Sequence, residues 1–261
     1  MIYIYLKTAN LYFKDYLQSL TYPIIDSCDS LTSDDIVLFI NRVPDININY
    51  KYAIINMEQL NKINVLPYLK SYGAKIGDYS LGNKTFMSEL IYLPYQINLS
   101  EIVKLETFLN CQKEYDVVFN GNMTPRRKEI VTLLKRNNIK VFYKKVFDDE
   151  RDAIVGKSKI LLNVHCKTQF NTFESLRCDR WIMSGHVIVS ESSINDDDYD
   201  LRELYIKTDY NNLLSCIQNT LSDYDAIKQN LNNKLRNTFN VICNNRNVEK
   251  QNFETQIKID N

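Results

Sequence analysis

Residues 116–128 combine side chains and backbone groups that could hold a diphosphate. A short apolar run ends there, and the residues that follow it are, in order, Asn120, Gly121, Asn122, Met123, Thr124, Pro125, Arg126 and Arg127. Thr124 can cap a helix whose first position is Pro125. The free N–H groups of that first turn, the positive end of the helix dipole and the two arginines would then converge on one anion. The alternative is an ordinary strand-to-helix turn with solvated arginines, because a single glycine matches neither a dinucleotide fingerprint nor a P-loop.

A second group of polar residues lies at the end of another apolar run, which stops at Asn163 or His165. A helix is expected soon afterwards, and Glu174 and Arg177 would lie one turn apart on it. If the strands are parallel, Glu174 faces their carboxyl ends, where open α/β sheets bind ligands. Its carboxylate could there accept hydrogen bonds from both hydroxyl groups of a ribose. The alternative is a surface ion pair that contributes little.

The elements that must position these residues are indicated by short apolar runs rich in Ile and Val, which are typical of buried strands. In the first half of the chain the runs are residues 2–6, 36–40, 53–56, 75–77 and 90–93, and in the second half they are residues 116–120, 139–143, 160–164 and 187–190. Helical patterns separate them. This alternation of strand and helix predicts α/β layers around mostly parallel sheets.

Two domains are expected from the chain length and from a polar stretch between the two series of strands. The boundary is placed near residue 112, so that a small N-terminal α/β domain spans residues 1–112 and a second domain spans residues 113–245. Apolar residues at three- and four-residue spacing predict a long helix over residues 222–245. The remaining residues, 246–261, form a polar tail that is expected to fray.

The overall composition argues against several classes of protein. The 261 residues include 32 Lys and Arg and 32 Asp and Glu, and a net charge of zero argues against a nucleic-acid partner. No apolar run reaches the roughly 20 residues of a transmembrane helix, and no signal-peptide pattern is recognised, so a cytoplasmic location is expected. The six cysteines lack a zinc-ligand spacing and are expected to be reduced thiols.

From Asp116 to Glu191 the sequence resembles the donor-binding domain of glycosyltransferases with the two-domain GT-B fold. The resemblance is especially to the retaining group-1 type and its spore-coat and viral relatives. The shared pattern is the Asn-Gly turn with paired arginines, Leu-Asn-Val-His ending at residue 165, Phe-Glu followed by an arginine, and Gly-His-Val-Ile-Val-Ser-Glu ending at residue 191. Residues 52–60, 76–80 and 91–95 are similar to landmarks of the acceptor domain.

The resemblance implies two Rossmann-like domains with a cleft between them, the first for the acceptor and the second for the donor. The implied reaction is transfer of a sugar from a UDP- or GDP-sugar to a hydroxyl group of a glycan or another acceptor. The residues implied at the donor are Asn120, Gly121, Asn122, Arg126, Arg127, Glu174 and Arg177, and the residues implied in catalysis are His165 and Glu191. Neither a metal nor a cofactor is expected, because arginines and helix N–H groups would stabilise the leaving diphosphate.

Two features keep other functions open. The family's pair of glutamates separated by seven residues is missing, since Ile182 stands at the second position, and the first domain is small. A sugar-nucleotide-binding or scaffold protein without turnover is therefore the alternative.

Asp196, Asp197 and Asp198 could bind Mn²⁺ or Mg²⁺, although Asp is also frequent in solvated turns.

Overall fold

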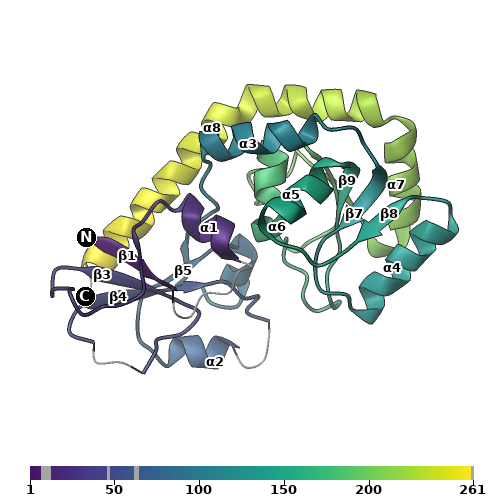
Figure 1. Cartoon of the computed structure of the whole chain (residues 1–261). Coiled ribbons are helices and arrows are strands. Elements are labelled where there is room, and N and C mark those ends of the chain that lie inside the picture. The colour runs from purple at the N-terminus through teal and green to yellow at the C-terminus, as the bar shows by residue number, and fades with distance from the viewer. Residues whose placement is uncertain (7–12, 46–47, 62–64, 260–261) are drawn as a thin grey trace. The chain divides into compact units, whose positions relative to one another are not determined.

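The computed structural model describes the chain except for residues 7–12, 46–47, 62–64 and 260–261. The chain divides into two compact units. Unit 1 comprises Met1–Gln96 together with Cys243–Asn261, and unit 2 comprises Ile97–Ile242. Each unit has a sheet with helices packed on it (Figure 1).

Unit 2 is built on a five-stranded parallel sheet with the order β11-β10-β9-β7-β8. Its strands are β7 (Tyr115–Phe119), β8 (Val141–Tyr143), β9 (Ser158–Asn163), β10 (Val187–Glu191) and β11 (Ile206–Thr208). The strands expected in the second half of the chain are confirmed, and β11 is an additional one. Because β8 lies on one side of β7 and the later strands lie on the other, the order reverses between β7 and β9.

Helices cover both faces of this sheet (Figure 1). They are α3 (Leu99–Leu109), α4 (Pro125–Arg136), α5 (Asp148–Gly156), α6 (Ser175–Met183), α7 (Leu213–Ser222) and the first part of α8 (Tyr224–Ile259). Alternate residues of the strands, such as Val117 and Phe119, form one core with Leu134 of α4 and Ile217 of α7. Helices α3, α5 and α6 pack against one another on the other face. The site described below therefore rests on a sheet that is buried on both sides.

The domain boundary expected near residue 112 is wrong, because α3 belongs to unit 2. Glu101 of α3 pairs with Arg180 of α6 at 2.8 Å, and Lys104 pairs with Asp149 of α5 at 2.6 Å. Few residues of α3 are apolar and buried, and they lie at helical spacing. The segment therefore resembles a polar linker in the sequence, although one face of it is part of a core.

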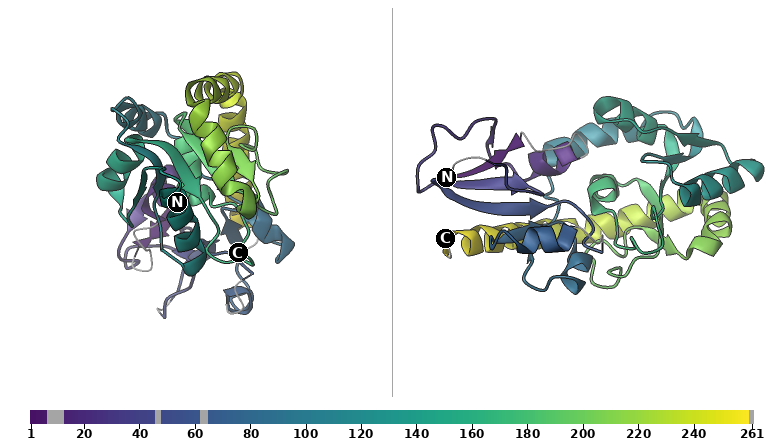
Figure 2. Two further views of the ribbon diagram at one scale, coloured as in Figure 1. Left: turned by 90° about the vertical axis from the view of Figure 1, so that its right-hand side faces the viewer. Right: turned by 90° about the horizontal axis from the view of Figure 1, so that it is seen from below.

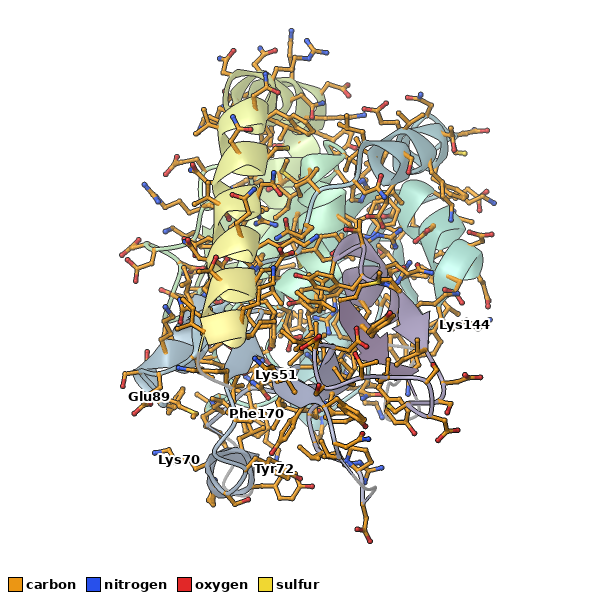
Figure 3. The ribbon with its side chains drawn as sticks, turned by 90° about the vertical axis from the view of Figure 1, so that its left-hand side faces the viewer. Lys51, Lys70, Tyr72, Glu89, Lys144 and Phe170 are labelled. Carbon is orange, nitrogen blue, oxygen red and sulfur yellow. The ribbon has the colours of Figure 1, made fainter. Side chains whose placement is uncertain are left out.

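Unit 1 has a six-stranded parallel sheet with the order β2-β1-β3-β4-β5-β6. Its strands are β1 (Ile2–Tyr5), β2 (Ile24–Ile25), β3 (Ile36–Ile40), β4 (Lys51–Asn56), β5 (Ile76–Asp78) and β6 (Ile91–Tyr92), and its short helices are α1 (Lys14–Ser19), α2 (Val65–Lys70) and the 3₁₀ helix η3 (Leu81–Thr85). Lys51, labelled in Figure 3, marks the start of β4. The first five strands have the same order as those of unit 2, so the prediction of two Rossmann-like domains is confirmed. The cleft stays a prediction.

The polar tail expected over residues 246–261 is wrong as far as residue 259, because α8 is one helix from Tyr224 to Ile259 (Figure 2). Its last turns return to unit 1, where Phe253 and Ile257 are fully buried. Gly77 of β5 makes this contact possible, since a Cβ there would lie 2.7 Å from the ring of Phe253. Two apolar residues one turn apart are too few to mark a buried helix in the sequence. Within the residues described, α8 and the other helices lack an apolar window long enough to cross a membrane.

Candidate functional site

The candidate residues gather at the carboxyl edge of the unit 2 sheet, at the ends of β7 and β9. This is the point where the strand order reverses, and open α/β sheets bind ligands at such points. The turn after β7 has the predicted form: Thr124 Oγ1 accepts a hydrogen bond from the N–H of Arg127 at 3.4 Å, and Pro125 begins α4. The sequence therefore predicted both the local turn and its place on the sheet.

Arg127 is a buried cation with neutral partners. Its side chain donates from Nε to the carbonyl oxygen of Val164 at 2.8 Å and from Nη1 to that of Asn122 at 3.0 Å. Burial, followed by the positive charge of Arg177, lowers the pKa of Arg127 to about 10, so it stays charged at neutral pH. Within the described residues, no carboxylate forms an ion pair with Arg127. A buried charge without a counter-charge is costly, so this position favours an anionic ligand.

Arg177 is the second cation of this pair. It donates from Nη1 to Asn163 Oδ1 at 2.7 Å. Arg127 and Arg177 both lie near the ring of Phe119, with guanidinium carbons 5.1 and 5.7 Å from its centroid. Gly121 leaves room for this arrangement, because a Cβ there would lie 3.2 Å from Nη2 of Arg177. The glycine is therefore needed for close approach of the guanidinium.

Glu174 lies beside the two cations, at the residue before α6 begins. Its carboxylate is 4.0 Å from Nη2 of Arg177, and its side chain is 22% exposed. Its charge also acts on Arg127 and His165. The sequence offered this pair as the alternative to a ribose site, and the two side chains do lie together, with α6 beginning one residue after Glu174. Contact of Glu174 with a ribose stays a prediction.

Arg126 has different partners from those of Arg127. Both of its Nη atoms donate to the carboxylate of Glu191, at the end of β10. Its guanidinium carbon lies 3.7 Å from the ring centroid of Tyr210, whose hydroxyl donates to the carbonyl oxygen of Arg126 at 2.8 Å. The charge of Arg126 is thus compensated within the protein. Direct roles of Arg126 at a diphosphate and of Glu191 at a sugar stay predictions.

His165 is 1% exposed and its backbone is held from two sides. Its N–H donates to Glu191 Oε2 at 3.1 Å, and its carbonyl oxygen accepts from Arg126 Nη1 at 3.2 Å. Ring atom Nε2 lies 3.1 Å from the carbonyl oxygen of Ser192, which can only accept, so Nε2 carries a proton. Burial lowers the pKa of His165, which keeps the ring neutral at pH 7. Nδ1 is then an acceptor, and it is buried without a partner among the described residues.

Asn120 and Asn122 shape the loops around the cations. Asn120 Oδ1 accepts from the N–H of Val146 at 3.0 Å, which ties the segment after β8 to the end of β7. Asn122 supplies the carbonyl oxygen that holds Arg127. Direct contacts of either residue with a donor stay predictions.

Two residues of the site were not predicted from the sequence. Tyr210 stands 84 positions after Arg126, and no local pattern links them. Ser192 offers only its backbone oxygen to His165, a contact that any residue type could make. The one signal available for Ser192 was its position directly after Glu191.

Two of the three aspartates at residues 196–198 have partners in the protein. Asp196 accepts from the hydroxyl of Tyr205 at 2.6 Å and from the N–H of Ser193 at 2.7 Å. Asp197 is 97% exposed and lies 3.3 Å from Lys207. In the part of the chain that the structure describes, no group of three or more His, Cys, Asp and Glu side chains is arranged to hold a metal ion. Independence of a metal stays a prediction.

Solved structures of glycosyltransferases share this fold. AviGT4, a glycosyltransferase involved in avilamycin A biosynthesis, matches with a TM-score of 0.58 and 8% identity over 98% of this chain and 96% of that chain. T4 phage BGT in complex with UDP and Mn²⁺ matches with a TM-score of 0.50 and 12% identity over 99% of each chain. An α1,3-fucosyltransferase matches with a TM-score of 0.50 and 8% identity over 88% of this chain and 79% of that chain. The chain therefore has the GT-B fold, and identities this low establish the fold alone.

Two relatives by sequence are proteins of a virus. Uncharacterized protein L140 of Acanthamoeba polyphaga mimivirus is 32% identical over 209 residues, which are 77% of this chain and 64% of that protein. Uncharacterized protein L138 of the same virus is 36% identical over 193 residues, which are 70% of this chain and 22% of that protein. The chain thus spans less than two thirds of either relative. No protein-family model matches it.

Proposed function

We propose that this chain is a glycosyltransferase that moves a sugar from a UDP- or GDP-sugar to a hydroxyl acceptor without a metal ion. The observation that supports the proposal most is the pair of cations Arg127 and Arg177 at the point where the strand order of the unit 2 sheet reverses. Their hydrogen bonds go to neutral oxygens, and the neighbouring carboxylate of Glu174 lies 4.0 Å from the nearer of them. Two guanidinium groups beside one carboxylate leave a positive charge that a diphosphate would compensate.

In the proposed reaction, Arg127 and Arg177 bind the diphosphate, and Glu174 accepts hydrogen bonds from the ribose hydroxyls. When the bond between the sugar and the diphosphate breaks, negative charge grows on the departing phosphate oxygen. Fixed cations stabilise that charge more strongly in a buried site than in water, which lowers the barrier. The shared fold supports this choice of reaction, and the UDP bound to T4 phage BGT makes UDP the first ligand to test.

The first experiment is calorimetric titration of the chain with UDP, GDP and CMP, each with EDTA and with added Mn²⁺. We expect UDP or GDP to bind in EDTA. Loss of one charge-assisted hydrogen bond costs about 1.5 to 3 kcal/mol, so Arg127→Ala and Arg177→Ala should each weaken binding at least about tenfold. Lys128→Ala is the matched control, because Lys128 is the next residue of α4 and is exposed.

The second experiment measures transfer or hydrolysis of the nucleotide sugar whose nucleotide binds. Turnover in EDTA supports a metal-independent transferase, and turnover only with Mn²⁺ corrects that part of the proposal. Binding without turnover across a broad set of acceptors supports the sugar-nucleotide-binding protein instead. Wild-type affinity in both arginine variants refutes the site.

A further inference from the structure

The loop after β9 holds the two neighbouring arginines with two consecutive carbonyl oxygens. Val164 accepts from Nε of Arg127, and His165 accepts from Nη1 of Arg126. His165 therefore follows directly on a residue that is hydrogen-bonded to the proposed diphosphate ligand Arg127. Its imidazole belongs to the immediate surroundings of the cation pair.

Arg126 and Glu191 together hold both polar groups of the His165 peptide unit. Glu191 Oε2 accepts from the N–H of His165, and Arg126 donates to its carbonyl oxygen, while the two side chains are also paired with each other. Tyr210 covers the guanidinium face of Arg126. Arg126 and Glu191 have exposures of 17% and 11%, so this ion pair is shielded from water.

The ring of His165 is held in one orientation as well. Nε2 faces the carbonyl oxygen of Ser192 at 3.1 Å and the hydroxyl of Ser193 at 3.3 Å. The charged side chains that act on the ring are Glu191, Glu174 and Arg126, but burial has the largest effect and lowers the pKa of His165. The ring is therefore neutral, and its Nδ1 has a lone pair with no donor among the described residues.

We propose that Arg126 and Glu191 are a positioning pair that clamps His165, and that Nδ1 of His165 accepts a hydrogen bond from a hydroxyl group of the transferred sugar. The proposal rests on the proposed function. It gives Arg126 and Glu191 roles that differ from direct contact with diphosphate or sugar. It also gives His165 a preference for a hydroxyl group over a phosphate oxygen, because two acceptors facing each other repel.

The clamp is tested first without any ligand, by ¹⁵N NMR of the imidazoles. The chain has two histidines, and the signals of His165 are those that disappear in His165→Gln. We expect a neutral ring protonated at Nε2 at pH 7. Arg126→Lys and Glu191→Gln should each produce a mixture of tautomers, because they weaken the hydrogen bonds that fix the His165 peptide. An Nδ1-protonated or doubly protonated ring in the wild type overturns the proposal, and so does an unchanged spectrum in both variants.

Ligand binding is tested next with UDP and UDP-glucose, or with GDP and GDP-mannose if the guanine nucleotide binds. The nucleotide sugar should move the Nδ1 signal of His165, and the bare nucleotide should not. If a nucleotide sugar binds more tightly than its nucleotide and leaves Nδ1 unmoved, the proposed hydroxyl contact is wrong.

A matched pair of variants separates positioning from phosphate binding. Lysine keeps the charge of arginine but loses its planar fork. We expect Arg126→Lys to change the affinity for the bare nucleotide less than about threefold and to lower kcat at least tenfold, whereas Arg127→Lys should weaken the nucleotide about tenfold. Equal losses of nucleotide affinity in the two variants overturn the proposal. Failure of all the nucleotides to bind refutes the proposed function, while the ligand-free spectra still test the clamp.

Discussion

Replacing Gly121 by alanine should weaken nucleotide binding while leaving the fold intact. The new Cβ would lie 3.2 Å from Nη2 of Arg177 and 3.3 Å from Cζ of Phe119. Both distances are shorter than ordinary van der Waals contact, so one neighbour must move by a few tenths of an ångström. Arg177 is the neighbour that can move, because Phe119 is part of the sheet core.

The effect on stability should be small. Gly121 does not have a positive φ, so its backbone suits alanine. Substitution of such a glycine stabilises a protein by about 0.4 to 1 kcal/mol through the unfolded state, which offsets the crowding around Arg177. Affinity should respond more strongly. If Arg177 gives the diphosphate one charge-assisted hydrogen bond worth about 1.5 to 3 kcal/mol, a shifted guanidinium loses part of it. A loss of about 1 kcal/mol is about fivefold in Kd.

Calorimetry with the nucleotide that binds the wild type measures the affinity, and urea unfolding followed by the fluorescence of Trp181 measures the stability of unit 2. Trp181 is the only tryptophan of the chain, so its signal reports on this unit alone. Gly121→Val should weaken nucleotide binding further than Gly121→Ala. The control Lys128→Ala should change neither the affinity for the nucleotide nor the stability of unit 2. Wild-type affinity in both glycine variants would show that the position of Arg177 does not matter to the ligand, and the reasoning from the cation pair would fail.

Three further predictions concern single side chains. Glu174→Gln should weaken binding of UDP or GDP about tenfold, because charged hydrogen bonds to the ribose are lost. Inorganic pyrophosphate has no ribose and should bind the variant no more weakly than the wild type. Equal weakening of both ligands in calorimetry contradicts the ribose role. Arg180→Met should destabilise unit 2 by about 1.5 to 3 kcal/mol in urea unfolding, because Asp152, which is 1% exposed, loses its two-pronged partner and keeps Arg151 at 2.8 Å; an unchanged midpoint refutes this. Burial raises the pKa of Asp78 from 3.8 to about 7, although the hydrogen bonds of Asn56, Ser80 and Asn83 lower it. The folded state therefore holds this proton more tightly than the unfolded state. The stability of unit 1 should fall as pH rises from about 4 to 7, by on the order of 4 kcal/mol. Hydrogen exchange of β4 and β5 at pH 5 and pH 7 checks this, and Asp78→Asn should show a smaller loss than the wild type.

Features that depend on neighbouring residues could be predicted from the sequence. The strand at residues 116–120, the cap at Thr124 and the helix start at Pro125 are local, and the structure confirms them. The gathering of the candidate residues was predictable as well, because parallel strands bring their carboxyl ends to one edge. The roles of these residues toward a ligand stay predictions. The domain boundaries were not predictable in this way. They depend on where a weakly apolar helix docks, as α3 shows with Ile102 and Leu105 and the end of α8 shows with Phe253.

Arg126 and Arg127 show why the finer assignment of a site needs the fold. In the sequence they are two equal cations in the first turn of one helix. An α-helix has 3.6 residues per turn, so consecutive side chains leave it in directions about 100° apart. One of them meets Glu191, 65 positions away in the sequence, and the other meets the carbonyl oxygens of Val164 and Asn122. Glu191 thus neutralises the charge of Arg126, whereas the carbonyl oxygens leave the charge of Arg127 in place. The paired arginines at the start of this helix therefore predicted a positively charged site, and the strand that ends beside each arginine decides which of them keeps an uncompensated charge.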